Sequence, residues 1–244
     1  MKIKKLYNVY KYIVTGMVLL FLLISCNVSD DSIIQKEYIL PNYSVAYINL
    51  ISDITLVQDT CYEMIFKGTQ RNLDNFEFEI RDDTLFVSNL RKMLFRIEDI
   101  PAISLHFINL RSLVTYKPAT VHNKDTLHLG YFYFYPIGEI GEASLIVNCE
   151  TFGLDNSANS LGHFYVRGLA GNVYLFNRYG CSIFTDSLLC REAQVINESI
   201  GDVYINASEN LRVYLWGTGN IYYYGEPNIQ LIEKRNTGRI IHLK

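Results

Sequence analysis

A repeated glycine is the sequence feature that most limits what this chain can fold into. In the second half of the chain, glycine precedes a short hydrophobic run at intervals of 18, 21, 18 and 19 residues. These five glycines are Gly162, Gly180, Gly201, Gly219 and Gly238, and a half-period copy begins at Gly171. A fixed period near 20 residues, with short strands in each repeat, is typical of a solenoid.

The residues after each glycine alternate as a half-buried strand requires. The second and fourth positions, such as Phe164 and Val166 or Val203 and Ile205, are expected to point inward. The residue between them should point outward, which predicts a surface stripe of Tyr165, Ile183, Tyr204, Tyr222 and Ile240. Because coils stack about 4.8 Å apart, this stripe would form a continuous binding surface, or a surface covered by the N-terminal strands or a second subunit.

The first half of the chain also predicts strands, and no window shows a helical period. Residues Phe76 to Ile80 alternate, and Asp82-Asp83 supplies a turn before Thr84 to Val87. An antiparallel sandwich is the alternative fold, because alternation occurs in both. The regular glycine spacing favours an all-β, single-stranded solenoid (a β-helix) of roughly 20-residue coils. We expect regular coils over about 145–244 and a less regular β region before them.

The first 25 residues are typical of a signal peptide. A start with four lysines precedes a 12-residue hydrophobic run, Ile13 to Ile24, which is shorter than the roughly 20 residues that a membrane-spanning helix needs. Leu23-Ile24-Ser25-Cys26 resembles the lipobox of bacterial lipoproteins, which implies cleavage before Cys26 and lipidation of its thiol. The alternative is a plain secretory signal with an incidental cysteine.

These features divide the chain into a lipoprotein signal peptide (1–25), a lipidated tether (26–37) and a β-solenoid domain (38–244). Asn27 at the second mature position is not the aspartate associated with retention in the inner membrane, and Asp30-Asp31 resembles a short surface-export signal. We therefore expect attachment to the outer membrane through the lipid anchor, facing the cell surface, with a periplasm-facing domain as the alternative.

Charge and cysteine content exclude some partners and leave others open. Without residues 1–25, the 22 basic side chains fall to 18 against 25 acidic ones, a net charge of −7 that disfavours nucleic acid. No CxxC pair occurs. We expect Cys61, Cys149, Cys181 and Cys190 to be small buried side chains, with a Cys181–Cys190 disulfide as the alternative.

Catalytic and metal-binding patterns are missing from the sequence. The five histidines, His106, His122, His128, His163 and His242, show no zinc-like spacing, and no cofactor motif occurs. Carbohydrate-active β-helix enzymes, such as polysaccharide lyases and hydrolases, place two or three carboxylates on adjacent turns. Here the acidic residues of the repeat fall at unlike offsets, so an enzyme is the alternative and not the expectation. Two carboxylates in one cleft, within about 10 Å of each other, would favour that alternative.

Two segments of the repeat resemble the putative auto-transporter adhesin family with the head GIN domain. Leu161 to Ala170 is similar to the family's repeated Gly-x-φ-x-φ-x-Gly-x-Ala unit, and Gly217 to Pro227 is similar to its closing Gly-x-Gly-x-Ile-x-Tyr-x-Gly-x-Pro. Asp83 to Val87 resembles the end of its opening hairpin, whereas Tyr116 to Gly141 fits the pattern poorly. The resemblance implies a right-handed β-helix in a lipoprotein, and implies no chemistry.

We therefore predict a non-catalytic module of the cell envelope, adhesive or structural, that needs no metal or cofactor. The expected partners are the membrane, through the lipid on Cys26, and a glycan or an envelope protein, through Tyr165, Tyr204 and Tyr222. Oligomers are compatible with this prediction.

Overall fold

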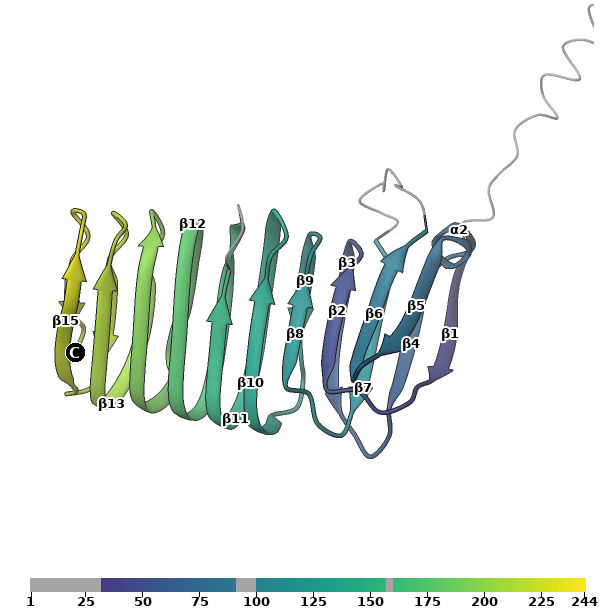
Figure 1. Cartoon of the computed structure of the whole chain (residues 1–244), viewed down its shortest axis with the longest axis horizontal. Coiled ribbons are helices and arrows are strands. Elements are labelled where there is room, and N and C mark those ends of the chain that lie inside the picture. The colour runs from purple at the N-terminus through teal and green to yellow at the C-terminus, as the bar shows by residue number, and fades with distance from the viewer. Residues whose placement is uncertain (1–31, 91–99, 157–159) are drawn as a thin grey trace, which may run out of the picture. The chain divides into compact units, whose positions relative to one another are not determined.

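The computed structural model describes residues 32–90, 100–156 and 160–244. Residues Ile33–Lys244 form one compact unit, in which sixteen described strands join a single sheet that winds into a solenoid (Figure 1). The predicted all-β solenoid is confirmed: about six turns of about 21 residues follow a curled, mixed N-terminal sheet.

The elements follow one another with few irregular connections. The N-terminal region contains β1 (Ile33–Ile39), β2 (Val45–Asn49), β3 (Ser52–Gln58), β4 (Glu63–Thr69), the short helix α2 (Gln70–Asp74), β5 (Phe76–Arg81), β6 (Thr84–Asn89) and β7 (Ala102–Phe107). The coils contain β8 (Ser112–Thr115), β9 (Ala119–His122), β10 (Leu127–Pro136), β11 (Ile140–Asp155), β12 (Leu161–Ser199), β13 (Val203–Leu215), β14 (Ile221–Tyr224), β15 (Asn228–Lys234) and β16 (Ile240–His242).

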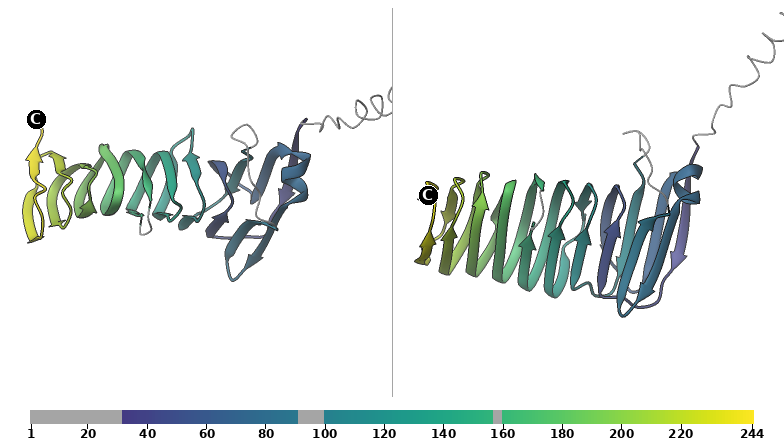
Figure 2. Two further views of the ribbon diagram at one scale, coloured as in Figure 1. Left: turned by 90° about the horizontal axis from the view of Figure 1, so that it is seen from above. Right: turned by 45° about the horizontal axis from the view of Figure 1, so that its top comes forward.

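Each coil contributes one segment to each of two faces, and neighbouring segments on both faces are parallel (Figure 2). Face A contains β3, β9, β14 and β16 with the opening segments of β11 and β13. Face B contains β2, β8 and β15 with the closing segments of β10, β11 and β13. The long strand β12 bends around the corners and supplies two segments to each face. Segment 116–141, which fits the repeat poorly, nevertheless pairs in the same parallel register.

The N-terminal region departs from this pattern. There β1, β4 and β7 pair antiparallel, and β5 and β6 form a hairpin. The predicted turn is present, and Asp82 and Asp83 both have positive φ, at 47° and 65°, as a type I′ hairpin turn requires. Strand β1 begins at Ile33, so the sheet starts inside the stretch 26–37 that the sequence predicted as a tether.

The core lies between the two faces and is filled by the alternating inward residues. Of the residues predicted to point inward, Phe164, Val166, Val203, Ile205 and Ile221 are buried, and Tyr223 is partly buried and packs against the core. Four phenylalanines, Phe132 and Phe134 of β10, Phe152 of β11 and Phe164 of β12, are at most 1 % exposed. Each buried side chain of this size contributes roughly 1.5–3 kcal/mol, so this cluster stabilises the middle coils.

Candidate functional site

Four aromatic rings stack on face A, one from each of four successive coils. They are Tyr165, Phe184, Tyr204 and Tyr222, and we refer to them as the aromatic ladder. Their ring centroids are 4.7, 5.1 and 4.8 Å apart, with interplanar angles of 9°, 16° and 12°. This spacing is the distance between paired strands, because the parallel register places each ring above the equivalent residue of the previous coil.

The prediction of an outward-facing side chain is wrong for two members of the stripe, Ile183 and Ile240. Ile183 is fully buried, because it pairs with the inward Val203 and leaves Phe184 beside Tyr204. The residue equivalent to Gly201 is therefore Cys181 and not Gly180. Ile240 pairs with the buried Ile221 and packs against the core, so that the neighbouring Ile241 pairs with Tyr222.

The ladder presents ring edges and hydroxyl groups to solvent. The two inner rings, Phe184 and Tyr204, have both faces covered by their neighbours and are partly buried. Tyr222 at one end is also partly buried, whereas Tyr165 at the other end is 50 % exposed. Burial also raises the pKa of Tyr204, and the nearby Asp202 adds to this effect. The Tyr222 hydroxyl accepts a hydrogen bond from Asn220 Nδ2 at 3.3 Å. The hydroxyls of Tyr165, Tyr204 and Tyr222 can therefore donate and accept hydrogen bonds along the solenoid axis, and the ring of Phe184 separates the first from the other two.

A group of polar side chains lies on face A before the ladder begins. His122 Nε2 is 2.9 Å from Thr55 Oγ1, and His122 Nδ1 is 3.2 Å from Asp53 Oδ1. Asp53 and Glu142 line a cavity of about 420 Å³ together with hydrophobic residues of β7, β9 and β11. Strand β9 lies between β3 and β11, so the backbones that carry the two carboxylates are two strand spacings apart, about 9–10 Å.

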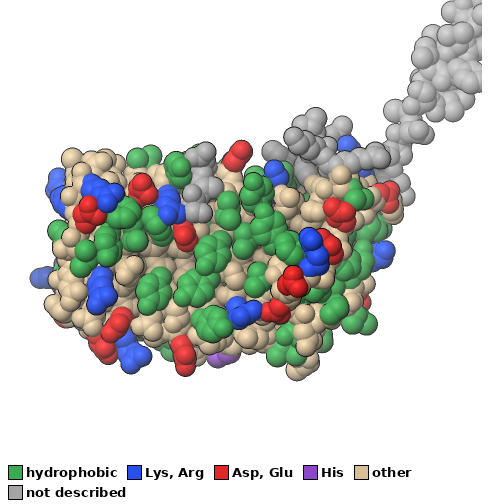
Figure 3. Space-filling model, viewed as in Figure 1, with side chains coloured by type: hydrophobic (Ala, Val, Ile, Leu, Met, Phe, Trp, Pro, Cys, Tyr) green, Lys and Arg blue, Asp and Glu red, His purple; other side chains and the backbone are tan. Residues whose placement is uncertain are grey.

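Hydrophobic side chains also gather over β10, β11 and β12 in the view of Figure 3. On face B, Tyr133 pairs with Gly153, and Gly153 pairs with Tyr174. Tyr174 is 45 % exposed. The repeat pattern did not single out Tyr133, and it marked Tyr174 only as part of the half-period copy that begins at Gly171.

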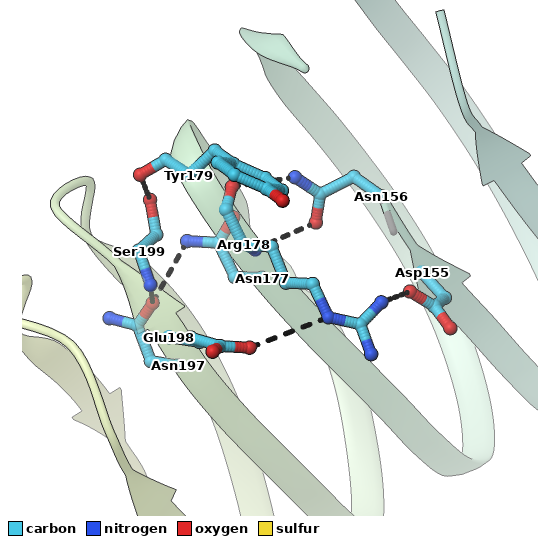
Figure 4. A network of polar contacts seen from close by, with 8 residues as sticks. All are labelled: Asp155, Asn156, Asn177, Arg178, Tyr179, Asn197, Glu198 and Ser199. Carbon is cyan, nitrogen blue, oxygen red and sulfur yellow. Dashed lines mark hydrogen bonds and ion pairs between the residues drawn. The ribbon is translucent and has the colours of Figure 1, made fainter. Parts of the chain in front are cut away.

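Buried amides form a polar corner where the face B segments end (Figure 4). Asn156, Asn177 and Asn197 are fully buried on successive coils. Asn177 Nδ2 donates to Asn197 Oδ1 at 3.1 Å, and Asn156 exchanges two hydrogen bonds with the backbone of Arg178. These contacts satisfy the polar backbone of the corner, which indicates a structural role. In the sequence, these asparagines are separated by 21 and 20 residues, and this spacing, close to one coil, was the signal that could have identified the corner.

The Arg178 guanidinium lies beside this corner and between two carboxylates. It is 2.8 Å from Asp155 Oδ1 and 3.5 Å from Glu198 Oε2. Burial raises the pKa of Asp155, although the arginine acts in the opposite direction. The same guanidinium lies 3.3 Å from the ring centre of Phe176. The arginine is therefore fully engaged within the protein.

The four described cysteines all carry free thiols, so the alternative of a Cys181–Cys190 disulfide is not realised. Cys149, Cys181 and Cys190 are buried as predicted, but the prediction is wrong for Cys61, which is exposed. Burial raises the pKa of Cys149 and of Cys190 to about 12. These two thiols are therefore chemically inert in the folded protein.

Other predicted features give no further site. Cys26 and the signal segment lie outside the described residues. Within the described ranges, no helix is long and hydrophobic enough to cross a membrane. The same ranges contain no group of three or more His, Cys, Asp or Glu side chains placed to hold a metal ion.

Residues 44–227 match the family model described as "Putative auto-transporter adhesin, head GIN domain". No curated protein is significantly similar to the chain. Among solved structures, a putative adhesin from Bacteroides fragilis NCTC 9343 is similar with a TM-score of 0.81 at 19 % identity, covering 88 % of this chain and 99 % of that one.

Two solved structures from Parabacteroides distasonis ATCC 8503 share the fold at 14 % identity. A putative adhesin has a TM-score of 0.65, and a putative lipid binding protein has a TM-score of 0.61. Both comparisons cover 88 % of this chain and 98 % of the other protein. At such identities the similarity establishes the fold and leaves the ligand open.

Proposed function

Because the chain belongs to the family of putative auto-transporter adhesins with a head GIN domain, we propose that it is a non-catalytic adhesive module of the bacterial cell envelope. In this proposal the lipid on Cys26 attaches the protein to the outer membrane, and the domain faces the cell surface. The aromatic ladder of face A contacts a glycan or protein on another surface. The ladder is the observation that carries the proposal, since it is a regular row of stacked aromatic rings on the surface of face A, three of which carry hydroxyls.

Labelling with an alkyne analogue of palmitate tests the anchor. In cells that express the full chain, the wild-type protein should carry the label and fractionate with the outer membrane, because Cys26 follows a lipobox-like segment. Cys26→Ser should lose both properties, whereas Cys61→Ser, which removes an exposed thiol, should keep them. Label that persists in Cys26→Ser would contradict lipidation at this residue. Protease treatment of intact cells then separates a surface location from a periplasmic one.

Removing the ladder hydroxyls should abolish adhesion while preserving the fold. In the triple variant Tyr165→Phe, Tyr204→Phe, Tyr222→Phe, the rings still stack, so the free energy of unfolding should change by no more than about 1 kcal/mol. Binding to whole cells should fall by about tenfold or more if the hydroxyls form the contact. Flow cytometry with labelled protein measures this, and Tyr179→Phe, at a corner residue that is 52 % exposed, is the matched control.

The outcomes separate the roles of the ladder. Unchanged binding by the triple variant would mean that the hydroxyls do not form the contact surface. Cells treated with periodate lose intact glycans, and cells treated with protease lose surface proteins, so the treatment that removes binding identifies the class of partner. The corresponding triple serine variant should unfold more easily, because it loses the stacked rings.

A carbohydrate-active enzyme is the second candidate, and the cavity between β3 and β11 is the observation that favours it. Inverting glycosidases separate their two carboxyl groups by about 6.5–9.5 Å, and the Asp53 and Glu142 backbones are about this far apart. We expect no release of reducing sugars from plant and bacterial polysaccharides by the wild-type protein. Release that disappears in both Asp53→Asn and Glu142→Gln, at unchanged melting temperature, would replace the adhesive proposal with a hydrolytic one.

A further inference from the structure

Face B contains a shallow groove formed by two adjoining cavities over β10 to β13. One cavity, of about 200 Å³, lies around Gly153 and is bordered by Tyr133 and Tyr174. The other, of about 160 Å³, lies over the next coils and is bordered by Asn172, Glu192 and Arg212. Tyr174 and Gln194 line both cavities, so the two form one continuous depression, which we call the face B groove.

Gly153 creates the deeper end of the groove. It lies between Tyr133 and Tyr174 in the parallel register, so one outward side chain is missing from this row. A Cβ atom at Gly153 would overlap the Tyr133 ring and would lie 2.5 Å from its Cε1 atom. The glycine therefore lets the Tyr133 ring lie across the backbone of the next coil, where the ring forms part of the floor of the groove.

The polar side chains of the groove have unused hydrogen-bonding capacity. In the part of the chain that the structure describes, the side chains of Asn172, Gln194 and Arg212 make no hydrogen bond or ion pair. Arg178 on the same face behaves differently, since two carboxylates engage it. The side chains of Asn172, Gln194 and Arg212 come from three coils and line one depression. There they offer amide and guanidinium donors, which are planar groups.

The groove contains charges of both signs. Arg212 and Glu192 line the same cavity, and Asp155, which lines the other, is paired with Arg178 at 2.8 Å. A ligand with a net charge of either sign would therefore meet a like charge nearby. The combination of exposed aromatic surface, free amides and balanced charge suits a neutral ligand with many hydroxyl groups and one hydrophobic face.

We propose that the face B groove binds a neutral oligosaccharide. The 45 % exposed ring of Tyr174 packs against the hydrophobic face of one sugar, because tyrosine combines a large apolar surface with a polar tip. Gln194 and Arg212 donate hydrogen bonds to hydroxyls of the same or the next sugar, and Glu192 accepts one. This inference rests on the proposed function, because it names a ligand class for the adhesive module, but it places the site on the face opposite the ladder.

Calorimetric titration of the full chain tests the proposal. The protein is purified in a detergent without a sugar headgroup and titrated with neutral hexasaccharides of xylose, mannose, glucose and N-acetylglucosamine, and with trigalacturonic acid as the acidic comparison. At least one neutral sugar should bind saturably. Tyr174→Ala should weaken that binding by about tenfold or more, as truncation of a central aromatic contact does. The double variant Gln194→Ala, Arg212→Ala, which leaves the aromatic surface intact, should weaken it as well.

Tyr116→Ala is the matched control, since Tyr116 is 47 % exposed and lines neither cavity of the groove, so sugar binding should stay unchanged. Binding of trigalacturonic acid alone, no binding of any neutral sugar, or equal binding by wild type and by folded Tyr174→Ala or the double variant would each overturn the proposal. Cell adhesion that survives Tyr174→Ala and is lost in the ladder variants would remove the groove from adhesion while leaving the proposed function intact. If every variant kept both adhesion and sugar binding, the result would contradict both the proposed function and the groove proposal.

Discussion

Gly201→Ala should lower the free energy of unfolding by about 3 kcal/mol or more, although it adds a single methyl group. A Cβ atom at Gly201 would overlap the carbonyl oxygen of Cys181 in the preceding coil and lie 2.7 Å from its carbonyl carbon. Neither atom can move without breaking the parallel register, because both belong to the backbone. The same approach recurs one coil later, where a Cβ atom at Gly219 would overlap the Gly201 carbonyl oxygen.

Urea denaturation followed by fluorescence of the single tryptophan, Trp216, measures this effect through the transition midpoint. Trp216 reports on the regular coils, since its Nε1 donates to Glu233 Oε2 on β15 at 2.9 Å. Gly130→Ala is the matched control: a Cβ atom there would meet nothing within 4 Å, so stability should stay the same or rise by less than about 1 kcal/mol. Equal midpoints for Gly201→Ala and Gly130→Ala would show that the coils at Gly201 lie farther apart than they do in the structure.

Asn197→Ala should cost about 3 kcal/mol, through lost hydrogen bonds and not through lost hydrophobic contact. The Asn197 amide donates to the Gly201 carbonyl at 3.1 Å and accepts from the Ser199 amide at 3.2 Å and from Asn177 Nδ2 at 3.1 Å. The Asn197 side chain that makes these three hydrogen bonds is fully buried. Truncation leaves several of these groups without a partner in a dry corner, and each such group costs roughly 1–3 kcal/mol.

The same denaturation experiment measures this loss, with Asn148→Ala as the control. Asn148 is also an asparagine in a coil, but its side chain is exposed on β11 and makes no hydrogen bond in the described structure, so its loss should change stability by less than about 0.5 kcal/mol. Asn197→Asp adds a second test. A buried carboxylate should destabilise the corner more at neutral pH than at acidic pH, because protonation removes the buried charge. A cost below 1 kcal/mol for Asn197→Ala would mean that water enters the corner and satisfies its backbone.

Part of the ladder was predictable from the sequence, and part was not. Tyr204 and Tyr222 follow glycines that are in register, so counting from Gly201 and Gly219 places them correctly. The count failed at Gly180, because the structure aligns Cys181 and not Gly180 with Gly201. A shift of one residue exchanges the inward and outward positions of a strand, which is why Ile183 is in the core and Phe184 is in the ladder. Glycine marks where coils approach closely, but Cys181 occupies an equivalent position, with its Sγ 3.1 Å from the Ser160 carbonyl oxygen.

The face B groove could not be predicted in the same way. Its residues come from the closing segments of successive coils, and only the segment with Asn172 and Tyr174 follows a glycine of the repeat, Gly171. Gly153 contributes by lacking a side chain opposite Tyr133. The sequence alone determined the period, the alternation and therefore the solenoid, because these depend on the local pattern of small and hydrophobic residues. Only the tertiary structure decided which outward side chains become neighbours, because that depends on the register between coils, and one residue gained or lost at a corner changes it.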